Sequence, residues 1–164
     1  MDLFTSYYAN LKKIPMDYAA VGISRVCPDW LNGDKAPSNF YFWNENLFAP
    51  SIDLLSDIKS NMIDQSVYTI CYYKELNERF HFKSDNGRSL ISYIDDLKRR
   101  FFDYSAIVFL CCEKPTEFCH RHLLRELLLF YNVSISELPY DKNENKSKET
   151  TSSKIQTSNS NSLF

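Results

Sequence analysis

Glycine is scarce in this chain, with three glycines among 164 residues. The phosphate loops of Walker-type and dinucleotide-binding proteins need closely spaced glycines, because their backbone N–H groups approach the phosphate directly. Gly22, Gly33 and Gly87 lie too far apart to form such a loop. The sequence therefore excludes both classes of nucleotide-binding motif.

Long hydrophobic runs and a secretory leader are also missing. No apolar run approaches the ~20 residues that cross a bilayer. The N-terminus lacks the basic segment and the apolar core of a signal peptide. We therefore expect a cytoplasmic protein with no membrane partner, in which the five cysteines are thiols rather than a disulfide framework.

A strong net charge is absent as well. The formal charge of −2 argues against a protein held to nucleic acid by its overall field, although it leaves room for a local basic groove. The basic run at residues 98–100 ends a predicted helix, where the helix dipole alone favours cations. A nucleic-acid partner therefore has only weak support from the sequence.

The chain does contain the material of one folded domain, with 44% apolar and 15% aromatic residues. Apolar runs predict strands, and apolar residues at helical spacing predict helices between them. The predicted strands are residues 3–7, 18–24, 106–112 and 133–138, and the predicted helices are residues 51–64, 67–80, 89–102 and 117–131. This order predicts an α/β fold, a single Rossmann-like domain whose mostly parallel sheet is flanked by helices.

Two segments stand apart from this pattern. Residues 25–50 are rich in proline and aromatic residues, and we predict a long loop that serves either as a functional lid or as a cover for one end of the sheet. Residues 141–164 are almost entirely polar, so they cannot bury enough apolar surface to fold. We expect an α/β domain over residues 1–140 and a disordered polar tail over residues 141–164.

The most informative segment joins the apolar strand at residues 106–112 to the next helix. Free N–H groups and the positive dipole end at a helix start bind anions and lower thiol pKa values. Cys119, His120 and Arg121 lie at this helix start. We predict that Cys119 is an activated thiol, that His120 is its proton partner, and that Arg121 binds an anionic ligand.

Further candidate residues follow from the predicted sheet. If the strands at residues 3–7 and 18–24 neighbour the strand at residues 106–112, their carboxyl ends meet at the crevice where such sheets bind ligands. The ligand-binding residues expected there, besides Arg121, are Thr5, Ser6, Ser24, Arg25 and Cys111.

Other interpretations of the same residues remain open. Cys111 and Cys112 are adjacent on a strand, so they point to opposite faces, and Cys112 is expected to pack in the core. A zinc site of Cys111, Cys119 and His120 is an alternative, but the sequence offers no clear fourth ligand. A phosphatase loop from Cys112 to Arg121 is too long and lacks glycine.

The chain resembles domain-of-unknown-function family 488. That family has a strand ending in cysteine, an acidic turn with lysine and proline, and then Cys-His-Arg at a helix start. The resemblance spans roughly residues 3–138 and is carried by the segments 4–15, 21–30, 47–51 and 110–128.

The resemblance implies a compact α/β domain and no settled activity. Its pattern carries over to Cys111, Cys119, His120 and Arg121, and also to Thr5, Ser24 and Arg25. Cys112 falls outside the pattern. Many members have Asp-x-Arg near the second strand, where this chain has Ile23-Ser24-Arg25.

Two functions are compatible with these residues. The first is binding of a small anionic ligand such as a nucleotide or another nucleobase-bearing molecule, with cysteine-assisted transfer or hydrolysis. The second is a non-catalytic module that sequesters a ligand or engages a protein partner. The sequence names no cofactor, no oligomeric state and no specific substrate.

Overall fold

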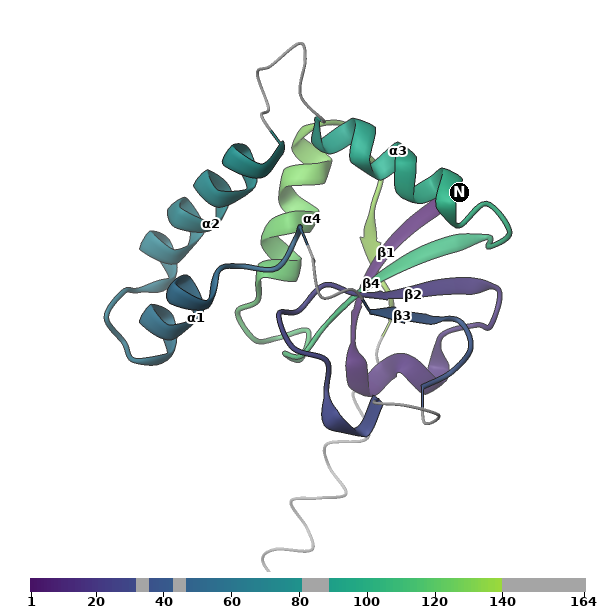
Figure 1. Cartoon of the computed structure of the whole chain (residues 1–164), viewed down its shortest axis with the longest axis horizontal. Helices are drawn as coiled ribbons and strands as arrows, with labels where there is room; N and C mark the ends of the chain where they lie inside the picture. Colours follow the sequence, from purple (N-terminus) through teal and green to yellow (C-terminus); the bar gives the residue numbers. More distant parts are fainter. Residues whose placement is uncertain (32–35, 43–46, 81–88, 140–164) are drawn as a thin grey trace, which may run out of the picture.

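A five-stranded parallel sheet forms the centre of the protein (Figure 1). The computed structural model describes residues 1–31, 36–42, 47–80 and 89–139. The strands lie in the order β3-β2-β4-β1-β5, and every pair is parallel. Their bounds are β1 Asp2–Tyr7, β2 Tyr18–Gly22, β3 Phe40–Phe42, β4 Ala106–Cys111 and β5 Ser136–Glu137. The predicted α/β class with a parallel sheet flanked by helices is confirmed.

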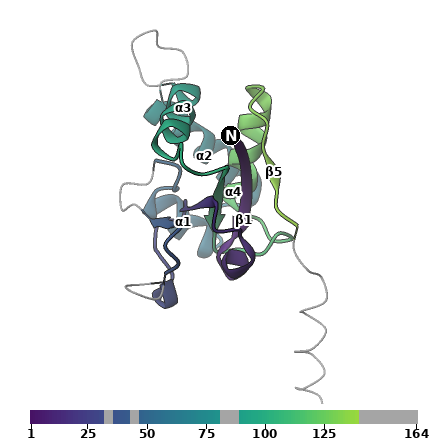
Figure 2. The same cartoon turned by 90° about the vertical axis from the view of Figure 1, so that its right-hand side faces the viewer.

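In their described residues, the connections between strands carry four α-helices and two short 3-10 helices (Figures 1 and 2). The α-helices are α1 Ile52–Lys59, α2 Gln65–Phe80, α3 Leu90–Arg100 and α4 His120–Phe130, and the 3-10 helices are η1 Tyr8–Lys13 and η2 Asp29–Leu31. Within the described ranges, no helix combines the length and the apolar character that crossing a bilayer requires.

The two faces of the sheet are covered differently. All six residues of β4 are buried, and their side chains alternate between two core clusters. Ile107, Phe109 and Cys111 pack with residues of α1 to α4, whereas Val108 and Leu110 pack with residues of η1 and η2. The sheet therefore has a helix side and a 3-10 side.

Serine caps begin two of the helices, as their sequences suggest. The side chains of Ser51 and Ser89 accept hydrogen bonds from backbone N–H groups three residues later, at the starts of α1 and α3. Helix α1 ends at Lys59, earlier than the predicted residue 64, and Asn61 adopts a positive φ of 57° just beyond it. Asparagine tolerates this left-handed conformation better than most residues, so the chain turns there into α2.

The predicted long loop at residues 25–50 contains structure that the sequence pattern did not reveal. Strand β3 and helix η2 lie within it, each only three residues long. Elements this short show no periodicity, and the aromatic residues of β3 are equally compatible with a loop. Gly33 of this segment, Gly87 and the predicted tail at residues 141–164 lie outside the described residues.

Gly22 allows β2 to end close to its neighbours. A Cβ atom at this position would lie 2.6 Å from Cδ2 of Phe42 and 2.7 Å from the hydroxyl oxygen of Tyr8. Any larger residue would therefore displace one of these aromatic side chains. This close approach brings Tyr8 to the carboxyl edge of the sheet beside β2.

Candidate functional site

Three strand ends meet at one edge of the sheet, as the sequence predicted. Strand β4 lies between β1 and β2, with Tyr7 paired to Cys111 and Gly22 paired to Leu110. Helix α4 returns to this edge and begins at His120, with Cys119 as its N-cap. The carboxyl edge of a parallel sheet is the usual place for a ligand site.

On the helix side of this edge lies a group of four side chains, which we call the thiol cluster: Cys111, Glu113, Cys119 and His120. The Oε2 atom of Glu113 is 3.1 Å from Sγ of Cys111 and 3.0 Å from Sγ of Cys119. Sγ of Cys111 is 3.7 Å from both ring nitrogens of His120. The predicted residues Cys111, Cys119 and His120 are therefore brought together, and all three are buried.

The backbone holds two members of the thiol cluster in place. The Sγ atom of Cys119 accepts a hydrogen bond from the backbone N–H of Arg121, at a distance of 3.4 Å. The Nε2 atom of His120 lies 3.0 Å from the carbonyl oxygen of Ile23. Because a carbonyl oxygen only accepts, Nε2 carries a proton in this contact.

The thiols of the site differ in acidity. Burial raises the pKa of the Cys111 thiol well above its ordinary value, and its hydrogen bonds to the other two thiols add to this effect. The hydrogen bond from Cys111, together with His120, lowers the pKa of Cys119 to about 6 against the opposing effect of burial. Cys111 also lowers the pKa of Cys112 to about 7, again against burial.

Glu113 shares the negative charge of the cluster. Burial acts to raise the pKa of its carboxyl group, but hydrogen bonds from the thiols of Cys119 and Cys111 outweigh burial and lower the pKa overall. Ionised Cys119 and ionised Glu113 repel each other at this distance. The negative charge is therefore a property of the Cys119–Glu113 pair rather than of one atom.

A pocket of about 420 Å³ opens on the 3-10 side of the same edge. Its lining includes Tyr8, Val26, Cys27, Trp30 and Cys112. Cys112 is exposed, in contrast to the core position expected from the sequence. Since Cys111 belongs to the helix-side core, the two adjacent cysteines serve different sides of the sheet.

Ser24 and Ser6, both predicted to bind a ligand, are buried and bonded within the protein. The hydroxyl of Ser24 lies 2.6 Å from that of Tyr8 and donates to the carbonyl oxygen of Val26, at 2.8 Å. The hydroxyl of Ser6 accepts a hydrogen bond of 3.1 Å from Nδ2 of Asn10. Ser24 therefore holds the side chain of Tyr8, which lines the pocket, and Ser6 holds η1 through Asn10.

Arg121 and Thr5 meet a carboxylate of the protein itself. The Arg121 side chain is 0% exposed, and its Nη2 atom lies 3.3 Å from Oε1 of Glu137. Arg121 also donates to the carbonyl oxygen of Glu113 at 3.0 Å and to Nε2 of His122 at 2.9 Å. Thr5 donates its hydroxyl proton to the same Glu137 carboxylate. Glu137 thus occupies the position at which an anionic ligand of Arg121 was expected.

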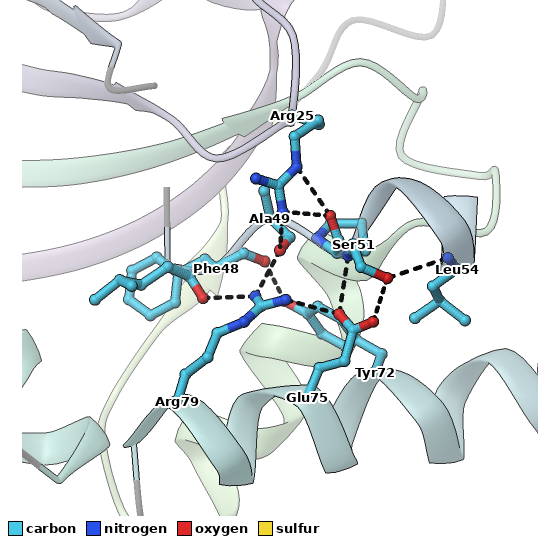
Figure 3. Close-up of polar contacts among 10 residues, drawn as sticks. Arg25, Phe48, Ala49, Ser51, Leu54, Tyr72, Glu75 and Arg79 are labelled. Carbon is cyan, nitrogen blue, oxygen red and sulfur yellow. Dashed lines mark hydrogen bonds and ion pairs between the residues drawn. The ribbon is translucent and has the colours of Figure 1, made fainter. Parts of the chain in front are cut away.

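Arg25 binds partners of its own, which differ from those of Arg121 (Figure 3). Its guanidinium donates to the carbonyl oxygens of Ala49 and Pro50, at distances of 2.7 to 3.2 Å. Arg79 of α2 binds the neighbouring carbonyl groups and pairs with Glu75 at 2.7 Å. These arginines hold the segment that precedes α1, and the predicted role of Arg25 in ligand binding stays a prediction.

Sequence reasoning missed two members of this region. Glu113 is not among the predicted site residues, although an acidic residue two positions after a strand-end cysteine lies at the ligand edge of a parallel sheet. The pocket was missed because it forms between η1, η2 and Cys112, which are far apart in the chain. Among the residues that the structure describes, Cys111, Cys119 and His120 form a group that could hold a metal ion, and their ligand atoms lie within 4.8 Å of one another.

Comparison with known proteins identifies a family for the chain. A search of curated proteins and a search of solved structures return no match. A family model described as "Active DUF488-N3 subclade" matches residues 5–132, which include the thiol cluster and both sides of the carboxyl edge. This match confirms the resemblance seen in the sequence, and the chain belongs to the DUF488 family.

Proposed function

We propose that this protein is a thiol-dependent enzyme that performs a transfer or hydrolysis on a small ligand bound in the pocket beside Cys112. The observation that carries the proposal is an exposed thiol in the wall of a pocket at the carboxyl edge of the sheet. In this chemistry the cysteine thiolate attacks an electrophilic carbon of the ligand, the bond to the leaving group breaks as the bond to sulfur forms, and the leaving group takes up a proton from solvent. Water or a second acceptor then displaces the sulfur, which restores the thiolate and releases the product. The description of the matching subclade as active agrees with this proposal.

The sequence-predicted pair Cys119 and His120 has a supporting role in this proposal. Both side chains are buried and lie on the other side of β4 from the pocket. They therefore act on Cys112 through Cys111, which lies between them, rather than on the ligand itself. Cys112 is the residue that would touch the reacting atoms.

The pocket favours a ligand with a planar group. Trp30 and Tyr8 offer aromatic rings, and base–aromatic stacking contributes about 1–3 kcal/mol. Among the described residues that line the pocket, Asp29 alone carries a charge. We therefore propose a nucleobase-bearing ligand, whose anionic part, if it has one, must reach a cation outside the pocket lining.

Differential alkylation tests this proposal on the full chain. Iodoacetamide is applied near neutral pH, and mass spectrometry follows the labelling of each cysteine. We expect Cys112 to label fastest, and adenosine or AMP to slow its labelling. Adenosine and AMP are compared because equal protection would assign recognition to the base, whereas stronger protection by AMP would add an anion subsite.

Two variants make the test specific. Trp30→Ala should remove the protection while leaving the labelling rate of the free protein unchanged. Cys71→Ser is the matched control, because Cys71 is a half-buried free thiol on α2 away from the pocket. Slow and uniform labelling of all cysteines would contradict the proposal. Protection without turnover would support the non-catalytic, ligand-sequestering alternative.

A further inference from the structure

The thiol cluster has the composition of a metal site, and the structure removes the objection raised by the sequence. Zinc sites in proteins use cysteine, histidine and carboxylate ligands, and structural sites need four of them. The sequence offered only Cys111, Cys119 and His120 at this place. Glu113 supplies a carboxylate oxygen within 3.1 Å of both sulfur atoms. We propose that Cys111, Glu113, Cys119 and His120 form a four-ligand site for Zn²⁺.

The distances among Cys111, Cys119 and His120 fit a tetrahedral ion with small adjustments. With Zn–S bonds of about 2.3 Å and Zn–N bonds of about 2.0 Å, ligand atoms around a tetrahedral zinc lie about 3.5 to 3.8 Å apart. The Sγ atom of Cys111 is already 3.7 Å from Nδ1 of His120. The ligand atoms of the two cysteines and the histidine all lie within 4.8 Å of one another. Glu113 is outside this group of three, so binding requires its carboxylate to turn toward His120 while moving about half an ångström away from both sulfur atoms, which replaces its hydrogen bonds with metal coordination.

The imidazole of His120 is oriented as a metal ligand. In metal sites, the ring nitrogen that does not bind the metal usually donates to a carboxylate or a backbone carbonyl group. Here Nε2 lies 3.0 Å from the carbonyl oxygen of Ile23, which leaves Nδ1, 3.7 Å from Sγ of Cys111, as the nitrogen available to a metal. The ring also packs edge-on against Tyr72, with centroids 5.7 Å apart, which restricts its rotation.

The ligand set selects the class of cation. Two thiolates and an imidazole favour zinc and other soft or borderline metals over magnesium and calcium, which prefer oxygen. Cys111 ends a buried strand and Cys119 caps a helix, so both sulfur atoms sit on rigid elements. Binding converts the two thiols to thiolates and releases their protons to solvent.

This site goes beyond the proposed function because Cys112 is not one of its ligands. Cys112 faces the pocket on the other side of the sheet and stays accessible when the metal binds, but the metal takes up Cys111 and removes its hydrogen bond to Cys112, so the labelling of Cys112 is compared on metal-free protein. Either proposal can therefore fail without the other. Loss of zinc binding with fast Cys112 labelling would reject only the metal site, and the reverse result would reject only the thiol chemistry.

Metal titration of the full chain tests the site. The reduced protein is stripped with a chelator and titrated with Zn²⁺ against a chromophoric competitor, and with Co²⁺ as a spectroscopic probe. We expect one equivalent of Zn²⁺ and a Co²⁺ spectrum with thiolate charge-transfer absorption. Cys111→Ser and Cys119→Ser should each weaken that absorption, whereas Cys112→Ser and Cys71→Ser should leave both readouts unchanged.

A milder variant guards against loss of folding. Glu113→Gln keeps the size of the side chain and should weaken Zn²⁺ binding roughly tenfold or more, since even partners behind the ligands contribute 10- to 100-fold. Circular dichroism confirms that each variant is folded. Substoichiometric Zn²⁺ binding by the wild-type chain would overturn the four-ligand site. An affinity for Zn²⁺ that is unchanged in both single variants, Glu113→Gln and Cys119→Ser, would overturn it as well.

Discussion

The Arg121 guanidinium is fully buried, and its charge is balanced by the carboxylate of Glu137 on β5. A buried charge left without its partner is costly, even where the intact pair contributes little net stability. The pair therefore acts as a constraint: both members must be present, or neither. Arg121, which the sequence predicts to bind a ligand, therefore also contributes to the fold through its pair with Glu137.

Removing one member of this pair should destabilise the protein strongly. Glu137→Gln leaves Arg121 buried without a counter-charge, so we expect the free energy of unfolding to fall by about 3–5 kcal/mol. Urea denaturation followed by circular dichroism measures the change. Arg99→Met removes a cation from the exposed Arg99–Asp96 pair and should change stability by less than about 1 kcal/mol. Similar effects of the two substitutions would contradict the buried role of Arg121.

His122 should give stability a pH dependence in the neutral range. Burial and the neighbouring Arg121 lower the pKa of His122 below its ordinary value of 6.5. The unfolded chain then takes up a proton that the folded protein does not, so stability should fall as the pH drops below about 6.5. Above that pH, His122 is neutral in both states and its contribution is constant.

Comparison with His122→Gln isolates this effect. We expect the variant to lose less stability than the wild type between about pH 7.5 and about pH 5.5, because glutamine has no proton to gain. Thermal melts at a series of pH values provide the measurement. An identical pH profile for the two proteins would show that His122 is not kept neutral by Arg121.

At the scale of elements, the N-terminus of α1 carries more than a simple cap. The Ser51 hydroxyl accepts a hydrogen bond from the N–H of Leu54 and donates to Glu75 of α2. The N–H of Ser51 also donates to Glu75, at 2.9 Å. Figure 3 shows this carboxylate joining the start of α1 to Arg79. The cap therefore connects two helices as well as beginning one.

The two serine caps should differ in their contribution to stability. Ser51→Ala removes the cap and leaves Glu75 with fewer donors, so we expect a loss above the ~1 kcal/mol of a typical N-cap. Ser89→Ala at α3 removes a cap that is bonded only to Ser92 among the described partners, and should cost ~1 kcal/mol or less. Denaturant titration of both variants checks the order. A larger loss for Ser89→Ala would contradict the link through Glu75.

The elements that the sequence could predict are those with a sustained pattern. Helices α2, α3 and α4 and strand β4 have apolar residues at regular spacing, and their predicted bounds agree with the structure within a few residues. Strand β3 has three residues and no periodicity. It joins the sheet because it pairs with β2, a long-range contact that local pattern does not reveal.

Part of the candidate site could be predicted because it depends on the order of strands and helices along the chain. Cys111, Cys119 and His120 lie close together because a strand end and the following helix start meet at the same edge, which topology implies. The partners of Arg121 and Arg25 come from distant segments. The sequence around each arginine does not show these partners, so it predicts a role in ligand binding. Only the fold shows that Glu137 and the carbonyl groups before α1 already bind them.

For the whole molecule, the order of the strands predicts the order of local opening. Strand β4 is buried throughout and pairs with β1 and β2 on its two sides. Strand β5 is an edge strand of two residues. Backbone amides of β4 should therefore exchange with solvent only through global unfolding, and those around β5 through local opening.

Hydrogen exchange measured by mass spectrometry or NMR tests this order. We expect peptides that contain residues 106–111 to show the slowest exchange, and those around residues 136–137 to exchange much faster. A Glu137→Gln variant should accelerate exchange near β5 more than near the centre of the sheet, in proportion to the lost ion pair. Equal protection of the two strands would indicate that β5 is held as firmly as the core.

The division of the sheet into two sides places two neighbouring cysteines in separate environments. One peptide bond separates Cys111 in the helix-side core from Cys112 at the pocket. Inserting one residue within β4 would place Cys111 where Cys112 now lies, and deleting one would place Cys112 where Cys111 now lies, because each change shifts the end of the strand by one position. The number of residues in β4 therefore matters to this site as much as their chemistry. A variant with a longer or shorter β4 would change where the thiols lie while keeping both cysteines, which no point substitution can do.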